Sequence, residues 1–146
     1  MKLVIRVMEE RDREAVVRLM RAFYASEAVF TNGSEEIFDR DVDECVGSSP
    51  FAEGYVFEEE GVLVGYGMLA KSYSTEFGKR CVWIEDVYVV EEARGKGVGS
   101  DFLHFVGEKY PGCVFRLEVE KENERVLRLY EKNGFTVLPY LEMKKE

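Results

Sequence analysis

The most informative part of the chain is an apolar stretch, Val82-Trp83-Ile84-Glu85-Asp86-Val87-Tyr88-Val89-Val90, followed by a glycine-rich turn, Arg94-Gly95-Lys96-Gly97-Val98-Gly99-Ser100. The first segment is typical of a buried strand, and an amphipathic helix is expected from Asp101 onward. Backbone N–H groups at the start of a helix form a site for an anion. Two carboxylates inside an apolar strand are costly unless they are paired or used. We therefore expect the turn to hold a phosphate-bearing cofactor and the strand to carry the chemistry.

The composition is that of a globular protein. With 146 residues, 46% hydrophobic and 34% charged, residues 1–146 are expected to form a single domain. No apolar run approaches the ~20 residues of a membrane helix, so no membrane partner is expected. The N-terminus lacks the apolar segment of a signal peptide. The three cysteines, Cys45, Cys81 and Cys113, are widely spaced, which favours free thiols in a reducing cytoplasm. With His104 as the only histidine, no metal site is expected.

The net charge of −9 is concentrated in one segment. Residues 26–60 hold eleven acids and one base, Arg40, and so carry −10. A field of this sign repels nucleic acid and attracts cations. The alternative is a solvated helix face and a charged hairpin turn, which we prefer for Glu58 to Glu60. For the acids between Glu27 and Glu44, both interpretations remain open.

The pattern of apolar residues predicts a mixed α/β (α+β) sheet with helices on both faces, in the order β-α-α-β-β-β-α-β-α-β-β. The expected elements are 2–8, 12–25, 34–46, 54–57, 62–69, 82–90, 101–110, 114–119, 123–133, 135–138 and 140–143. A turn is expected at 31–33 and a polar connection at 71–79. Asp12, Ser34 and Asn123 are expected helix N-caps, and Gly65 and Gly67 indicate a bulge or a close backbone approach.

Two local patterns point to chemistry, each with a simpler alternative. The turn at 94–99 is neither a Walker loop nor a dinucleotide fingerprint, and on its own it could be a plain helix entry loop. Its glycines let the backbone approach a ligand closely, and Arg94 and Lys96 add positive charge, which suits a pyrophosphate. Tyr130, in the last turn of a helix that ends at Gly134, is by itself better explained as a core-facing aromatic.

In combination, these patterns closely resemble the GNAT superfamily of acetyl-CoA-dependent N-acyltransferases. The resemblance rests on Arg94-x-x-Gly97-x-Gly99 after an apolar strand, then Asn123 and Leu129-Tyr130-Glu131-Lys132-Asn133-Gly134-Phe135. It covers the whole chain in element order and is specific from about Trp83 to Phe135. The run Glu85-Asp86-Val87-Tyr88-Val89 looks most like the diamine and spermidine/spermine acetyltransferase branch. One departure is Val126, where many members carry Ala.

The resemblance implies a fold with a splayed central strand pair and a set of site residues. The backbone of Val87 and Val89 would bond the pantetheine arm and thioester carbonyl, and amides of the turn would hold the pyrophosphate. Asn123 would contact the cofactor arm, and Tyr130 would lie near the thioester sulfur. The implied cofactor-binding set is Val87, Tyr88, Val89, Arg94, Gly95, Lys96, Gly97, Val98, Gly99, Ser100 and Asn123. A homodimer is also implied.

Acid–base chemistry gives roles to the remaining groups. An alkyl ammonium of pKa ~10 must lose a proton before it attacks a thioester, and Glu85 is the candidate base, acting through water. Asp86 is expected on the opposite side of the strand, where pairing with a basic neighbour is the simpler explanation, and its role stays open. The Val87 N–H can polarise the carbonyl, and Tyr130 can protonate the leaving thiolate.

Three further side chains receive simpler interpretations. Cys81 and Cys113 are expected to be buried strand thiols and not nucleophiles, because direct transfer needs no acyl-cysteine. His104 is expected to be a partly exposed structural residue.

We therefore expect transfer of acetyl from acetyl-CoA to a primary amine of a cationic small molecule such as a polyamine or diamine. Glu27 could bind a distal ammonium, and Glu85 is counted as substrate-binding as well as catalytic. The alternatives are a peptide or protein N-acetyltransferase, directed to N-termini or lysines, and a non-catalytic acetyl-CoA-binding regulatory module.

Overall fold

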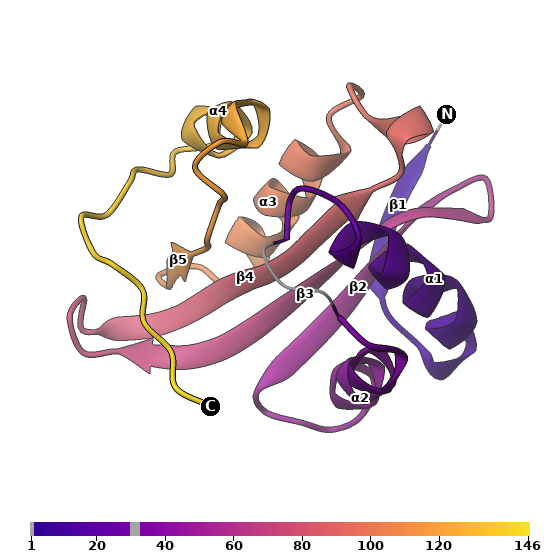
Figure 1. The fold of residues 1–146 in the computed structure, drawn as a ribbon, viewed down its shortest axis with the longest axis horizontal. Coiled ribbons are helices and arrows are strands. Elements are labelled where there is room, and N and C mark those ends of the chain that lie inside the picture. The colour runs from indigo at the N-terminus through magenta and orange to yellow at the C-terminus, as the bar shows by residue number, and fades with distance from the viewer. Residues whose placement is uncertain (1, 30–32) are drawn as a thin grey trace.

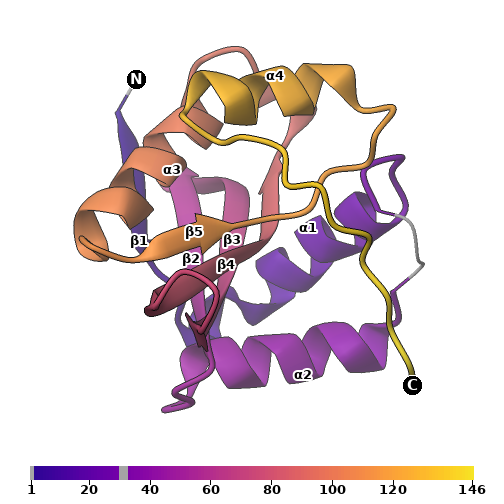
Figure 2. The same cartoon turned by 90° about the vertical axis from the view of Figure 1, so that its left-hand side faces the viewer.

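A mixed sheet with helices on both faces organises the computed structural model, which describes residues 2–29 and 33–146 (Figures 1 and 2). The strands follow the order β1-β2-β3-β4-β5, with β4 and β5 parallel and all other neighbours antiparallel. The strands are β1 Leu3–Val7, β2 Ala52–Glu59, β3 Val62–Ser74, β4 Lys79–Val89 and β5 Val114–Arg116. The helices are α1 Arg13–Tyr24, α2 Glu35–Val46, α3 Val98–Lys109 and α4 Glu124–Lys132, with short 3-10 turns η1 Glu10–Asp12 and η2 Glu91–Ala93.

The sheet separates two apolar cores. On one face, α1 and α2 pack over β3, with Val16, Met20, Val42 and Tyr66 wholly buried. On the other face, α3 packs on β2 and β3 through residues that include Phe57 and Phe102. The buried residues of α1 recur at helical spacing, as the sequence predicts; they are Val16, Val17, Leu19 and Met20. Figure 2 shows the two helical layers on opposite sides of the sheet.

Two of the three expected N-caps are confirmed. The Ser34 hydroxyl accepts the Ile37 N–H at 3.2 Å, and the Asn123 side chain accepts the Val126 N–H at 3.4 Å. Gly134 ends α4 with φ 93°, the left-handed conformation expected of a C-terminal glycine. Of the turn expected at 31–33, residues 31 and 32 lie outside the described residues.

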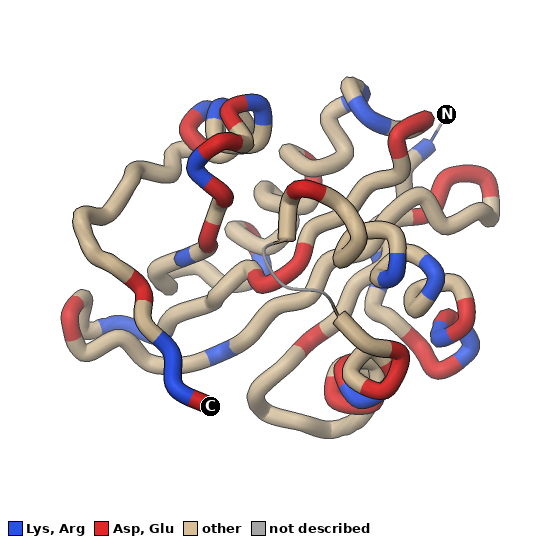
Figure 3. Tube along the Cα trace, viewed as in Figure 1, with Lys and Arg blue, Asp and Glu red and all other residues tan. Residues whose placement is uncertain are grey.

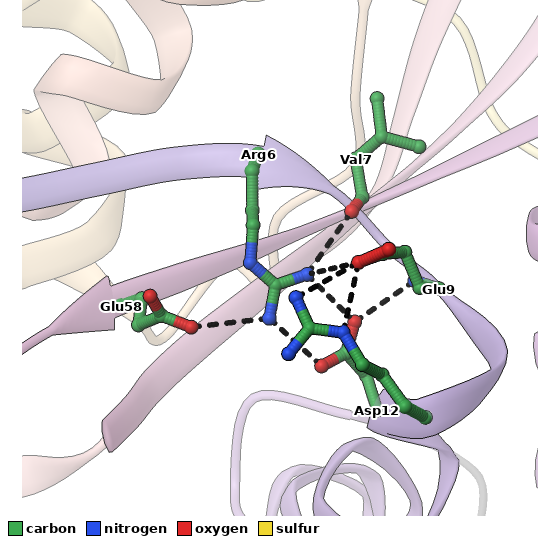
Figure 4. A network of polar contacts seen from close by, with 6 residues as sticks. Arg6, Val7, Glu9, Asp12 and Glu58 are labelled. Atoms are coloured by element: carbon green, nitrogen blue, oxygen red, sulfur yellow. Dashed lines mark hydrogen bonds and ion pairs between the residues drawn. The ribbon is translucent and has the colours of Figure 1, made fainter. Parts of the chain in front are cut away.

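The expected cap at Asp12 is wrong. Its carboxylate accepts two hydrogen bonds from the Arg6 guanidinium, each 2.9 Å, and one from the Glu9 N–H (Figure 4). Arg6 also donates to Glu58, at 3.1 Å. A bidentate, charge-assisted pair is stronger than a bond to a neutral helix N–H. The carboxylate therefore ties α1 to β1 and does not cap the helix.

The expected strands at 135–138 and 140–143 are also wrong. Residues 135–146 are described and none belongs to a strand. This C-terminal tail leaves α4 and runs toward the face that carries α1 and α2 (Figures 1 and 2). It meets no strand edge there, and an extended segment without a ladder partner is not stable as a strand. Leu141 and Met143 are each 89% exposed.

Several boundaries differ from expectation, and strand pairing explains those of β3 and β5. Residues 71–74, expected to be a connection, continue β3 because Lys71 to Ser74 pair with β4. The strand expected at 114–119 ends at Arg116, where pairing with β4 stops. Helix α3 begins at Val98, three residues before the position expected.

The two strand glycines mark close approaches, as expected. A Cβ on Gly65 would lie 2.3 Å from the Tyr88 carbonyl oxygen, and one on Gly67 would lie 2.4 Å from Phe102. These contacts require glycine on β3 because real Cβ atoms do not come so close to other atoms. They bring β4 and α3 into the positions from which the candidate site is built.

Candidate active site

Strand β4 loses its neighbour β5 halfway along its length. The two strands pair only through Cys81 to Trp83 of β4 and Val114 to Arg116 of β5. Beyond Trp83, β4 runs on to Val89 with a partner on the β3 side alone. This is the splayed strand pair that the sequence resemblance implies.

The direction of the backbone groups past this point follows from the ladder. The Val90 N–H donates to the Val64 carbonyl on β3 at 2.8 Å. Because antiparallel partners alternate, Tyr88 turns its N–H and C=O toward β3, and Val87 and Val89 turn theirs away. The Val89 carbonyl accepts a bond from the Arg94 side chain at 2.8 Å. The Val87 groups point to the side that β5 has left, where a ligand can bond to them.

The turn after β4 forms an anion site at the start of α3. Gly95 and Gly97 have φ 78° and 84°, and no side chain caps the helix. The first N–H groups of a helix have no partner within it, and here they coincide with the positive end of a 12-residue helix. Arg94 and Lys96 are exposed beside them. This arrangement of donors and charge fits a pyrophosphate.

A β-bulge places the two adjacent carboxylates. Met68 of β3 pairs with Asp86 and Leu69 pairs with Ile84, so Glu85 is an extra residue without a partner of its own. The bulge breaks the alternation of side chains along β4. Pairing of Asp86 with a basic neighbour is wrong, because Asp86 faces α1 and forms its hydrogen bonds with tyrosines.

Asp86 is the centre of a buried hydrogen-bond cluster. It is 6% exposed and accepts bonds from the Tyr66 hydroxyl at 2.7 Å and from the Tyr24 hydroxyl at 3.2 Å. Burial raises the pKa of Asp86 to about 6, although the two hydrogen bonds oppose the shift. Burial, together with the negative charge of Asp86, raises the pKa of both tyrosines. The hydroxyls therefore remain donors to Asp86.

Glu85 stands at the edge of the same acidic group. Its side chain is exposed, yet the surrounding protein displaces enough water to raise its pKa, and the charges of Asp86 and Glu142 add to that shift. Asp41 of α2 also has a raised pKa, mainly through burial; the charge of Arg40 opposes that shift and the charge of Glu85 adds to it. Figure 3 shows that acidic positions recur along α2. A carboxylate with a raised pKa is a better proton acceptor near neutral pH.

The other predicted residues are placed as follows. Tyr130 packs against the α3-side core with Val87 and Val89, and its ring meets Phe135 at 5.7 Å. Burial raises the pKa of Tyr130 to about 12, so its hydroxyl stays protonated. Asn123 uses its side-chain oxygen as the α4 cap. Tyr130 and Val87 thus pack against the same core, and the charge of Glu85 is felt by Tyr24 of α1 and Asp41 of α2 on the other side of the sheet.

No contact among the described residues connects Glu27 to this group. It lies exposed in the turn after α1.

The thiols and the histidine add no further group. Cys81 is buried on β4 as expected, whereas Cys113 lies just before β5 and is half-buried. His104 is exposed on α3 beside Glu108. In residues 2–29 and 33–146, no three His, Cys, Asp or Glu side chains gather as a metal site. No helix in those same residues has the length and apolar character needed to cross a membrane.

Sequence reasoning did not single out Tyr24, Tyr66 or Asp41 as site residues. Asp41 was noted only as one member of the acidic segment. A signal did exist for Tyr66, which is a large aromatic between Gly65 and Gly67 on β3. Tyr24 lies in the last turn of α1, where its spacing resembles that of an ordinary core residue.

Comparisons with known proteins agree with this geometry. The sequence profile of the acetyltransferase (GNAT) family matches residues 13–135. The thialysine N-epsilon-acetyltransferase of Bos taurus is 34% identical over 145 residues, covering 90% of this chain and 83% of that protein. The spermine/spermidine N(1)-acetyltransferase of Bacillus subtilis is 29% identical over 108 residues, covering 70% of this chain and 68% of its own.

Solved structures share the fold at lower identity. An aminoglycoside N-acetyltransferase in complex with CoA has a TM-score of 0.82 at 15% identity, covering 99% of this chain and 95% of the other. A possible acetyltransferase from Clostridium difficile 630 has a TM-score of 0.81 at 22% identity, covering 99% and 97%.

Proposed function

Because the chain belongs to the acetyltransferase (GNAT) family and is an N-acetyltransferase, we propose that it transfers acetyl from acetyl-CoA to a primary amine of a cationic small molecule. The observation that carries this proposal is the end of β4–β5 pairing at Trp83 and Arg116. Beyond it, Val87 has no strand partner on the β5 side, and the exposed Glu85 lies only two residues earlier in the chain. A thioester carbonyl bonded at Val87 would thus lie close to a candidate base.

The residues present fit acetyl-CoA, which supplies an acetyl group activated as a thioester. In our proposal the uncapped amides of Gly97 to Ser100, with Arg94 and Lys96, hold the pyrophosphate. Val87 and Val89 bond the pantetheine arm through backbone groups, and Asn123 contacts it. Since the Val89 carbonyl already accepts from Arg94, its N–H is the group available to the arm.

Proton transfers are assigned to Glu85 and Tyr130. Glu85 accepts the proton of the acceptor ammonium through water, and its raised pKa suits that role near neutral pH. The Val87 N–H donates to the carbonyl oxygen as negative charge develops on it. Tyr130, which stays protonated, donates to the departing thiolate.

The acidic group beside β4 and the substrates named for two relatives support a cationic amine as the acceptor. Glu85, Asp86 and Asp41 form an acidic group beside β4, which attracts a cationic amine. Two relatives are named for acetylation of thialysine and of spermine or spermidine, all of which carry primary amines on flexible aliphatic chains. Glu27 remains a proposed contact for a distal ammonium.

A turnover screen with acetyl-CoA tests the proposal. The acceptors are polyamines, diamines, amino acids with side-chain amines, aminoglycosides and peptides with free N-termini or lysines. We expect turnover of small aliphatic amines. Turnover of peptides alone would replace the proposed acceptor with a protein substrate, and binding of acetyl-CoA without any turnover would favour a regulatory module.

We also propose that the protein acts as a homodimer in the cytoplasm. The C-terminal tail exposes Val137, Leu141 and Met143, which an isolated copy leaves in water. All three cysteines are free thiols, which suits a reducing compartment.

A further inference from the structure

Arg116 is an incompletely satisfied cation at the point where β4 and β5 separate. It lies opposite Trp83 at the last pair of the parallel ladder, and its guanidinium carbon is 4.7 Å from the centre of the Trp83 ring. Its Nε is buried and has no hydrogen-bond partner in the part of the chain that the structure describes. A buried donor without a partner costs free energy, and no carboxylate of the described residues forms an ion pair with this guanidinium.

Arg116 borders the same stretch of β4 as Glu85. Trp83 precedes Glu85 by two residues, about 6–7 Å along a strand. The C-terminal tail passes both groups. Its Tyr140 donates to Glu76, which raises the pKa of that phenol, while the charge of Arg116 partly opposes the shift.

Glu142 is the tail carboxylate near Glu85, at the other end of this stretch of β4. After burial and the charge of Asp86, the charge of Glu142 adds to the raised pKa of Glu85. The short tail segment 140–142 therefore passes from the surroundings of Arg116 to those of Glu85.

The site thus has opposite charges at its two ends. Glu85, with Asp86 and Asp41 behind it, favours an ammonium, while the planar guanidinium on Trp83 matches a carboxylate in bidentate geometry. A diamino acid has a carboxylate and a distal amine separated by roughly six bonds of about 1.5 Å each. A polyamine would instead bring a second ammonium toward the guanidinium, which is a repulsive contact.

We propose that Arg116 binds the carboxylate of the acceptor, so that this enzyme prefers diamino acids over carboxylate-free polyamines. This inference rests on the proposed function and narrows its substrate class. The reacting group is the side-chain amine, next to Glu85, and the carboxylate is the distal handle. A diamino acid is still a cation near neutral pH, so the acidic surroundings continue to attract it.

Matched acceptors test the inference directly. Lysine and cadaverine differ only by the carboxylate, as do ornithine and putrescine. For wild type we expect higher kcat/KM with each amino acid. Arg116→Gln should lower kcat/KM for lysine about 10- to 100-fold, the value of a charge-assisted hydrogen bond, and should not lower it for cadaverine, whose second ammonium the guanidinium repels. Arg116→Lys should restore part of the preference. Arg80→Gln, which removes an exposed arginine at the start of β4, should change neither acceptor.

Other outcomes separate this inference from the proposed function. An equal loss with lysine and cadaverine would show that Arg116 supports the strands only, and unchanged kinetics would also overturn its role. If wild type acetylates no amine, the proposed function fails, but binding still decides the inference. Trp83 is the sole tryptophan, so lysine should change its fluorescence in wild type and not in Arg116→Gln. An identical response in both proteins would overturn the inference.

Discussion

At the residue scale, Glu85 and Asp86 have different surroundings because β4 carries one extra residue against β3. Glu85 is exposed, whereas Asp86 is 6% exposed and accepts from two tyrosine hydroxyls. Burial raises the pKa of each carboxyl. Only Glu85 can exchange a proton with an incoming amine without disrupting the buried cluster. We assign the base to Glu85 and a positioning role to Asp86, which holds Tyr24 and Tyr66.

Glu85→Gln should lower kcat about 10²- to 10⁴-fold, because the acceptor ammonium loses its proton acceptor. The KM for acetyl-CoA should stay near its wild-type value, since the cofactor contacts lie beyond residue 86. In wild type, kcat should rise with pH as Glu85 ionises, at a pH above the ordinary range of a glutamate. The variant should lose that rise.

Glu108→Gln is the matched control for Glu85→Gln. It removes the same charge from the surface of α3, where Glu108 pairs with His104, and should leave kcat unchanged. A parallel loss of kcat and of acetyl-CoA affinity in Glu85→Gln would instead indicate a structural role for Glu85.

Asp86→Asn should change how stability depends on pH. Burial, the largest cause, raises the folded pKa of Asp86 from 3.8 to about 6. The protonated form is thus favoured in the fold, and its contribution to stability is fully present below pH 3.8 and lost as the pH rises through about 6. A shift of about two pKa units corresponds to roughly 3 kcal/mol.

Urea unfolding of wild type and Asp86→Asn at pH 4.5 and 7.5 measures this effect. The free energy of unfolding of Asp86→Asn, relative to wild type, should increase by about 2 kcal/mol between the two pH values, because part of the full effect is already lost at pH 4.5. Other carboxyls cancel in this difference. A difference that does not vary with pH would show that Asp86 titrates normally.

At the element scale, hydrophobic periodicity was sufficient where burial alone determines structure. It predicted α1, α2 and the three long strands, and Ser34 and Asn123 were correct caps. It failed where pairing decides the outcome. Polar residues 71–74 are strand because β4 lies beside them, and β5 ends where β4 diverges. Such boundaries depend on a neighbour distant in sequence, which a local pattern does not contain.

Gly97→Ala should damage the anion site at the start of α3. Gly97 has φ 84°, and an L-residue in that conformation costs about 1–2 kcal/mol. We expect lower stability and, because the loop amides shift, a KM for acetyl-CoA raised about tenfold or more, equivalent to losing one charge-assisted hydrogen bond. Steady-state kinetics and thermal unfolding measure the two effects.

Gly107→Ala controls for the loss of a glycine in the same helix. A Cβ at Gly107 meets no atom within 4 Å, so alanine should stabilise α3 by about 0.5–1 kcal/mol and leave the KM unchanged. An unchanged KM in Gly97→Ala would contradict pyrophosphate binding at this turn.

At the scale of the whole molecule, the site combines elements that no motif links. Tyr24 comes from α1, Asp41 from α2, Tyr66 from β3 and Arg116 from β5. Sequence spacing predicted the β4 and α3 parts of the candidate site because those are contiguous. It could not predict the bulge that turns Asp86 toward α1, since an extra residue on one strand is defined only by the register of the other.

The exposed C-terminal tail bears on whether the protein is a monomer or a dimer. Its two expected strands are not formed, and Leu141 and Met143 are each 89% exposed. In a monomer, replacing such residues by charged ones should cost little, because nothing covers them. In the proposed homodimer, each copy's tail would pack against its partner, and burial of one leucine contributes about 1.5–3 kcal/mol.

Leu141→Glu therefore distinguishes the two states. Twofold symmetry doubles the effect to about 3–6 kcal/mol, so the dimer Kd should rise by roughly two to four orders of magnitude. Sedimentation velocity should show wild type as a dimer and Leu141→Glu as a monomer at the same concentration. Val62→Glu makes the same change at a valine that is 64% exposed at the start of β3, and should remain a dimer. A monomeric wild type, or a Leu141→Glu variant that stays dimeric, would contradict the tail as the interface.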